Sequence, residues 1–90
     1  MKYFDIGETV ICTVRAKQEG IPKDPDSLQI SIYKPDGTVD INLAPMSRDD
    51  MGIWHYDYDT AGKGAGNYRG KVKAVTGLRI KLVNGSFRLQ

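Results

Sequence analysis

Cysteine, histidine and tryptophan each occur only once in this 90-residue chain. The single Cys12 cannot form an internal disulfide, so the fold must be held together by packing alone. One unpaired thiol suits a reducing compartment. The chain also lacks a Gly-x-Ser-x-Gly elbow and a second histidine beside His55 that could activate another nucleophile. We therefore expect no enzyme and no catalytic residue.

Long apolar runs are missing as well. No segment approaches the roughly 20 apolar residues that a membrane-spanning helix needs. The first eight residues contain no apolar h-region, so we expect no signal peptide and favour a cytoplasmic or virion-associated protein. The chain is long enough for a single domain over residues 1–90, with a modest core that requires neither metal nor disulfide.

What the sequence has in abundance is a period-two alternation of apolar and polar residues, which is typical of strands with one buried face. Two such arms follow one another within Met51–Ala74. The first arm is predicted to turn Trp54, Tyr56 and Tyr58 inward and His55, Asp57 and Asp59 outward. The second is predicted to turn Tyr68, Val72 and Ala74 inward and Arg69, Lys71 and Lys73 outward.

Turn signals recur at short spacing along the chain, which is the pattern of an all-β sandwich. Besides the two arms, we expect strands over Lys2–Ile6, Thr9–Lys17, Ser27–Lys34, Thr38–Leu43 and Leu78–Leu89. The last of these is expected to carry a bulge or bend at Asn84 and Gly85. The segments between strands are rich in glycine, proline and aspartate and are expected to be turns or loops: Gly20–Asp26, Pro35–Gly37, Pro45–Gly52 and Thr60–Gly66.

The run Gly66-Asn67-Tyr68-Arg69-Gly70 resembles the tyrosine corner of immunoglobulin-like domains, where the tyrosine closely precedes the second disulfide cysteine. Cys12 resembles the first cysteine, Gly70 stands in place of the second, and Trp54 lies later than the antibody tryptophan. The chain is thus most similar to disulfide-free immunoglobulin-like or fibronectin-III-like modules. Its turns resemble those of small phage or prophage proteins of this class, and also those of macroglobulin-type and cell-surface domains. The resemblance implies an antiparallel sandwich of about seven strands in two sheets.

Several polar residues could be taken as a metal or phosphate site. His55, Asp57 and Asp59 share one strand face, but successive side chains on a face lie about 6.5–7 Å apart, which is awkward for one ion. The aspartates of the turns lack a contiguous calcium loop and are explained by turn chemistry. The glycines of 62–66 lack the closing Gly-Lys-Ser/Thr of a phosphate-binding loop, and no helix is expected after them. We therefore expect no metal, no cofactor and no small-molecule substrate.

Charge is distributed unevenly along the chain. All eleven acidic residues lie at or before Asp59, whereas the segment 60–90 has seven cations and no acid. Alternation predicts that five cations share the outer face of one hairpin, where they form an anion- or partner-binding face: Arg69, Lys71, Lys73, Arg79 and Lys81. The competing interpretation is that these side chains protect the sheet from aggregation.

Two functions remain open from the sequence. The first is a non-enzymatic structural or interaction module that binds a protein partner, or self-assembles, through a sheet face or edge. By resemblance, its most specific version is a component of a phage or prophage particle. The alternative is an electrostatic binder of nucleic acid or another polyanion through the basic C-terminal hairpin.

Overall fold

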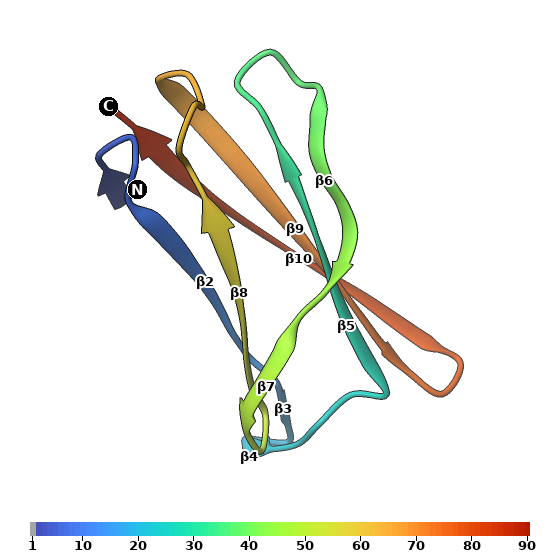
Figure 1. Ribbon diagram of the computed structural model, residues 1–90. Coiled ribbons are helices and arrows are strands. Elements are labelled where there is room, and N and C mark those ends of the chain that lie inside the picture. The colour runs from blue at the N-terminus through green and yellow to red at the C-terminus, as the bar shows by residue number, and fades with distance from the viewer. Residues whose placement is uncertain (1) are drawn as a thin grey trace.

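The computed structural model describes residues 2–90, which form ten β-strands in three sheets, with no helix among them (Figure 1). The all-β class expected from the sequence is confirmed. The strands are β1 (Lys2–Phe4), β2 (Thr9–Arg15), β3 (Lys17–Gln18), β4 (Ile21–Pro22), β5 (Ser27–Tyr33), β6 (Val39–Pro45), β7 (Ser47–Asp50), β8 (Ile53–Asp59), β9 (Gly66–Thr76) and β10 (Arg79–Leu89).

The larger sheet has the order β1-β10-β9-β5-β6, and only the contact between β1 and β10 is parallel. A second sheet has the order β2-β8-β7, and β3 and β4 form a small separate hairpin. Both chain ends lie at one end of the molecule, while the β3–β4 hairpin and the β9–β10 turn lie at the other (Figure 1).

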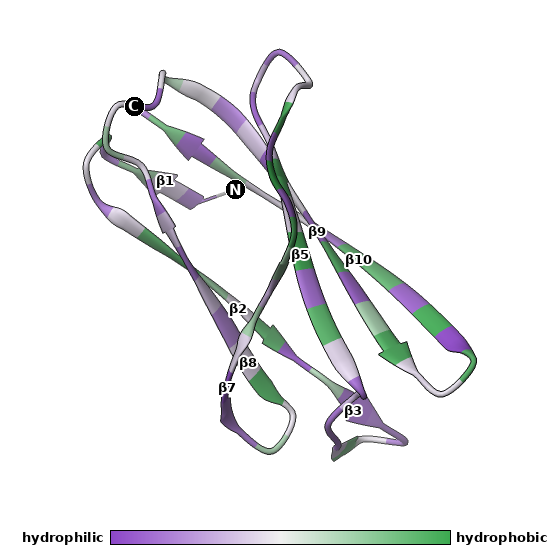
Figure 2. Ribbon diagram, turned by 45° about the vertical axis from the view of Figure 1, so that its right-hand side comes forward, coloured by the Kyte–Doolittle hydropathy of each residue, from purple (hydrophilic) through white to green (hydrophobic). Residues whose placement is uncertain are grey.

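The core lies between the two larger sheets and uses the inward residues that alternation predicts. Leu28, Ile30 and Ile32 of β5 are almost fully buried, as are Tyr58 of β8 and Tyr68 of β9. Figure 2 shows the resulting bands of apolar and polar residues along β9 and β10. Rings from both sheets meet in this core, since Tyr58 lies 5.8 Å from Phe87 of β10 and 6.2 Å from Tyr68 between centroids.

The strand count is where the structure differs most from the sequence-based expectation of about seven strands in two sheets. The segment 45–52 was expected to be a loop but contains β7, because the chain crosses from one sheet to the other at the buried Met46. The Met46 amide donates to the Leu28 carbonyl at 3.1 Å, which fixes the crossing point. The loop expected over Gly20–Asp26 likewise contains β4, which pairs with β3 around a turn at Glu19 and Gly20.

Two further local expectations can be compared with the structure. Pairing between β9 and β10 runs through Asn84 and Gly85 without a register shift, so the expected bulge is not formed there. The Tyr68 hydroxyl donates to the Gly64 carbonyl at 2.7 Å, four residues earlier in the chain. This is the type of bond that a tyrosine corner makes to backbone a few residues upstream.

A polar network joins the two sheets near the chain termini. Asp40 of β6 accepts hydrogen bonds from the Tyr58 hydroxyl and from the Lys63 ammonium group, and the Lys63–Asp40 distance is 2.9 Å. The hydrogen bond from Tyr58, with that from Lys63, holds the pKa of Asp40 below its ordinary value. Burial, with the bond to Asp40, raises the pKa of Tyr58 far above the ordinary range.

Among residues 2–90 there is no helix long and apolar enough to cross a bilayer.

Candidate partner-binding edge

The outer edge of β10 is left unpaired over most of its length. The short strand β1 pairs only with Phe87–Leu89, so Arg79–Ser86 has β9 on one side and, among the described strands, none on the other. The backbone N–H and C=O groups along such an edge can pair with another extended chain. The edge is therefore a place where the sheet can be extended.

The side chains along this edge are unusually apolar for an exposed strand. Ile80 is 62% exposed, Leu82 53% and Val83 42%, and Leu78 in the turn is fully exposed. Natural sheets normally protect long edges with charges, prolines or bulges. The opposite edge of the same sheet is protected in this way, because β6 ends at Pro45 and its pairing with β5 is irregular. The edge of β10 has no proline and no irregular pairing, and its charged residues over Arg79–Ser86 are Arg79 and Lys81.

The register of the hairpin separates the five cations that the sequence placed on one outer face. Directly opposite residues of an antiparallel pair lie on the same face. Lys73 is opposite Leu82, and Lys81 is opposite Ala74, which packs against the core. Arg69, Lys71 and Lys73 therefore lie on the outer face, whereas Arg79 and Lys81 lie on the face toward the other sheet. The expectation of a single five-cation strip is wrong.

The length of the turn explains this result. Thr76 pairs with Arg79, so only Gly77 and Leu78 lie between the paired ends of the hairpin. A loop of this length pairs odd-numbered residues of one strand with even-numbered residues of the other. Side chains do alternate between the two faces within each strand. The outward residues, however, are odd-numbered in β9 and even-numbered in β10, because the loop shifts the numbering of paired residues by one.

Arg79 and Lys81 line an open cleft between the two sheets, with a volume of about 400 Å³, at the end opposite the termini. Its apolar surface comes from Val14, Leu28, Val72, Ala74 and Val83. Its polar lining residues are Arg15, Lys17, Gln18, Lys23, Asp24, Thr76, Arg79 and Lys81, with Asp24 as the single carboxylate. Arg15 lies on the same face of β2 as Thr13, which is opposite His55, so the cations beside the cleft are Lys17, Lys23, Arg79 and Lys81. We call the apolar lining residues the floor of the cleft and these four cations its rim. Both lie directly beside the free edge of β10.

A second hollow of about 320 Å³ adjoins this cleft and shares Val14, Val72 and Val83 with it. It lies between the free edge of β2 and the middle of β10, and its lining includes Cys12. Burial raises the pKa of the Cys12 thiol, with a smaller contribution from the Asp57 charge. A thiol with a raised pKa is a poor nucleophile, so Cys12 behaves as a small apolar residue of the groove.

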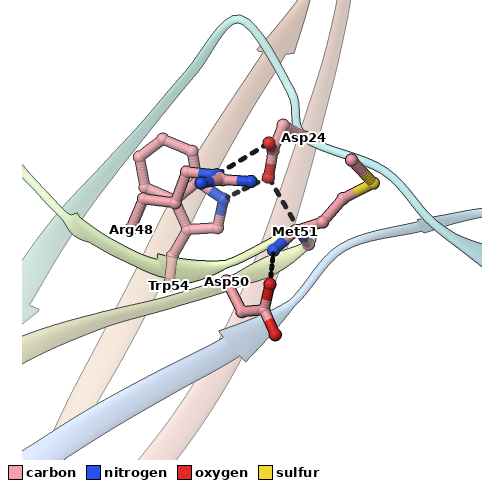
Figure 3. Close-up of polar contacts among 6 residues, drawn as sticks. Asp24, Arg48, Asp50, Met51 and Trp54 are labelled. Carbon is pink, nitrogen blue, oxygen red and sulfur yellow. Dashed lines mark hydrogen bonds and ion pairs between the residues drawn. The ribbon is translucent and has the colours of Figure 1, made fainter.

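The carboxylate in the cleft is already engaged by other groups, as Figure 3 shows. Asp24 accepts from the Gly52 amide at 2.8 Å, from the Trp54 indole at 3.3 Å and from the Arg48 guanidinium at 2.8 Å. The bond from Gly52 is the main cause that holds the pKa of Asp24 below its ordinary value. The Asp24 charge is therefore directed toward the β7–β8 turn, and the cations of the cleft remain available to a ligand.

His55 lies on the outer face of the other sheet, between two carboxylates. Its Nδ1 is 2.6 Å from Asp49 and its Nε2 is 3.8 Å from Asp57. Among residues 2–90, no group of three or more His, Cys, Asp and Glu side chains is arranged to hold a metal ion. Asp59 lies on the same face as Asp57 and faces solvent. The two sheets thus present faces of opposite charge, acidic beside β8 and basic along β9.

Alternation along the chain does not connect Arg15, Lys17 and Lys23 with the C-terminal hairpin. These residues lie far from it along the chain, and the β3–β4 hairpin places Lys17 and Lys23 at the cleft. The available sequence signal was the Glu19-Gly20 pair itself, and in the structure both residues have positive φ values, of 53° and 79°, as tight two-residue turns require. A Glu-Gly pair is a weak predictor of that turn compared with Asn-Gly.

Comparison of this chain with models of protein families, with curated proteins and with solved structures gave no match.

Proposed function

We propose that this protein is a non-enzymatic interaction module that binds a protein partner by accepting an extended segment along β10. The observation that carries this proposal is the unpaired edge at Arg79–Ser86, which exposes the apolar side chains of Ile80, Leu82 and Val83. Backbone pairing would supply affinity, and the exposed side chains of the edge would supply selectivity. The chemically reactive residues favour binding over catalysis, since Cys12 has a raised pKa and His55 lies on a separate face.

An immunoglobulin-like sandwich is the finer fold assignment that we propose within the all-β class. It is supported by the Tyr68–Gly64 bond and by β8 lying between β2 and β7 in one sheet while β9 lies between β5 and β10 in the other. The turn sequences alone support the more specific proposal of a phage or prophage particle component. A gene located among those for virion proteins is the expected result, and a location among unrelated metabolic genes would contradict this version.

The strand-addition proposal can be tested with an uncharged peptide of alternating threonine and valine, about ten residues long, added to the ¹⁵N-labelled protein. We expect slower amide exchange and shifted resonances along Arg79–Ser86. Leu82→Lys should weaken binding, because it places a charge on the apolar edge. Ile11→Lys is the matched control, since Ile11 is also an exposed apolar residue on an edge strand. Absence of binding, or equal loss in both variants, would refute addition at β10.

Polyanion binding is the second candidate function, and it is supported by the row of Arg69, Lys71 and Lys73 on the outer face of β9. Counterion release would make such binding weaken steeply as salt concentration rises. Titration of duplex DNA or heparin at low and moderate salt measures this slope. Absence of binding at low salt would exclude the polyanion function.

A further inference from the structure

We propose that the segment accepted by β10 is acidic and amphipathic, with its carboxylates directed into the basic cleft between the sheets. This inference rests on the proposed strand addition and specifies the chemical class of the partner. Two independent features support it, namely the free edge of β10 and the cationic rim of the adjoining cleft.

The pairing geometry converts these features into a pattern for the partner. Residues of an added strand that lie directly opposite Arg79 and Lys81 share the inner face with them, at Cβ separations of about 4.5–5.5 Å. Opposite charges at these two positions would be favourable. Residues opposite Ile80 and Leu82 lie on the outer face beside exposed apolar side chains, and the residue opposite Val83 faces the apolar floor. Along β10 from Arg79 to Val83, the partner should therefore read acidic, apolar, acidic, apolar, apolar.

The rim charges are not neutralised within the part of the chain that the structure describes. Four cations lie beside the cleft, namely Lys17, Lys23, Arg79 and Lys81, and its one carboxylate, Asp24, is bonded to Gly52, Arg48 and Trp54. An acidic segment would add the missing counter-charge without removing any existing ion pair. The same feature argues against the β10 strand of a second copy, because that copy would bring Arg79 and Lys81 to an edge that is already basic.

Backbone chemistry distinguishes an acidic peptide from other anions. An extended peptide both donates and accepts hydrogen bonds, so it satisfies the free N–H and C=O groups of the edge together. Nucleic-acid phosphates and sulfated sugars offer mainly acceptors on their charged groups and would leave the β10 carbonyl groups without partners. The edge and the cleft together fit an acidic polypeptide.

The test compares peptides of alternating glutamate and valine, lysine and valine, and threonine and valine, with heparin and duplex DNA as further probes. The edge variant is Arg79→Glu with Lys81→Glu. The matched control is Arg69→Glu with Lys71→Glu, which changes the net charge equally on the opposite face of the same hairpin. We expect the glutamate peptide to bind tightest to the unmodified protein, and to bind about tenfold more weakly to the edge variant but not to the control.

Three other outcomes of this experiment would contradict the acidic-partner inference, strand addition or both. If all three peptides bind equally, or if both variants lose the glutamate peptide equally, β10 accepts strands without a preference for acid, and the present inference is overturned while strand addition survives. If no peptide binds, both proposals fail. If heparin or DNA binds more tightly than the glutamate peptide, and the control variant abolishes this binding, the partner is a polyanion on the outer face.

Discussion

Gly52 is a position where a single added methyl group should have a large effect on stability. Its φ of +74° lies in the left-handed region, and a Cβ atom there would lie 2.5 Å from the Ala16 carbonyl oxygen. The Lys23 amide nitrogen and the Pro22 Cβ would each lie 3.1 Å away. Ala16 cannot retreat freely, because its amide donates to the Gly52 carbonyl at 2.6 Å and its carbonyl accepts from Lys23 at 3.1 Å.

The magnitude for Gly52→Ala follows from two contributions. The left-handed conformation costs a residue with a Cβ about 1–2 kcal/mol. Displacing Ala16 weakens a backbone hydrogen bond, which contributes about 1 kcal/mol. We therefore expect the free energy of unfolding to fall by about 2–3 kcal/mol, with each kcal/mol lowering the melting temperature by about 4–8 °C in a domain of this size.

Gly37→Ala is the matched control for this experiment. Gly37 has a φ of +89°, but no atom lies within 4 Å of its hypothetical Cβ. It should therefore show the conformational cost alone, about 1–2 kcal/mol. Urea unfolding followed by Trp54 fluorescence and by circular dichroism measures both variants. Equal losses of stability would refute the argument that close packing at Ala16 requires glycine at position 52.

Two further predictions concern the interior of the fold. Asp40→Asn should lower the free energy of unfolding at neutral pH by about 1–3 kcal/mol, because it removes the charge from the bonds to Tyr58 and Lys63. Since the folded pKa of Asp40 lies below its unfolded value, this stabilisation is present above about pH 4 and is lost as pH falls through the folded pKa. Urea midpoints from pH 7 to pH 3 should therefore decline less in the variant, and an identical decline would contradict the assignment. Gly70→Ala should raise stability by about 0.5–1 kcal/mol, because a Cβ there meets no atom within 4 Å; a lower urea midpoint would contradict this.

Alternation within single strands was a sound guide to the core. It placed Leu28, Ile32, Tyr58 and Tyr68 inward, and all four are buried. The reason is physical, since successive side chains of a strand point to opposite faces whatever the strand pairs with. The same local signal cannot reveal where a chain changes sheets. Met46 is the residue at which this happens, and it lies between Pro45 and the polar run Ser47–Asp50, a sequence that resembles an ordinary turn.

Residues on two strands can be assigned to a common face only when the register between the strands is known. The expected five-cation strip places Lys73 and Arg79 on one face because both are odd-numbered. The two-residue loop at Gly77 and Leu78 reverses that relationship, and β-hairpins with loops of this length are common. The loop length was therefore the signal that could have located Arg79 and Lys81 in advance.

The exchange of parity also changes how the two candidate functions relate to one another. A five-cation strip on one face would have made anion binding and strand addition compete for the same side chains. The register instead gives each function its own cations, with Arg69, Lys71 and Lys73 on the outer face and Arg79 and Lys81 at the cleft. Charge reversal on one face should leave the function of the other face largely intact, since exposed charges further apart than about 8–10 Å are screened at physiological salt. The two double variants, one with Arg79→Glu and Lys81→Glu and the other with Arg69→Glu and Lys71→Glu, therefore separate the functions within a single hairpin.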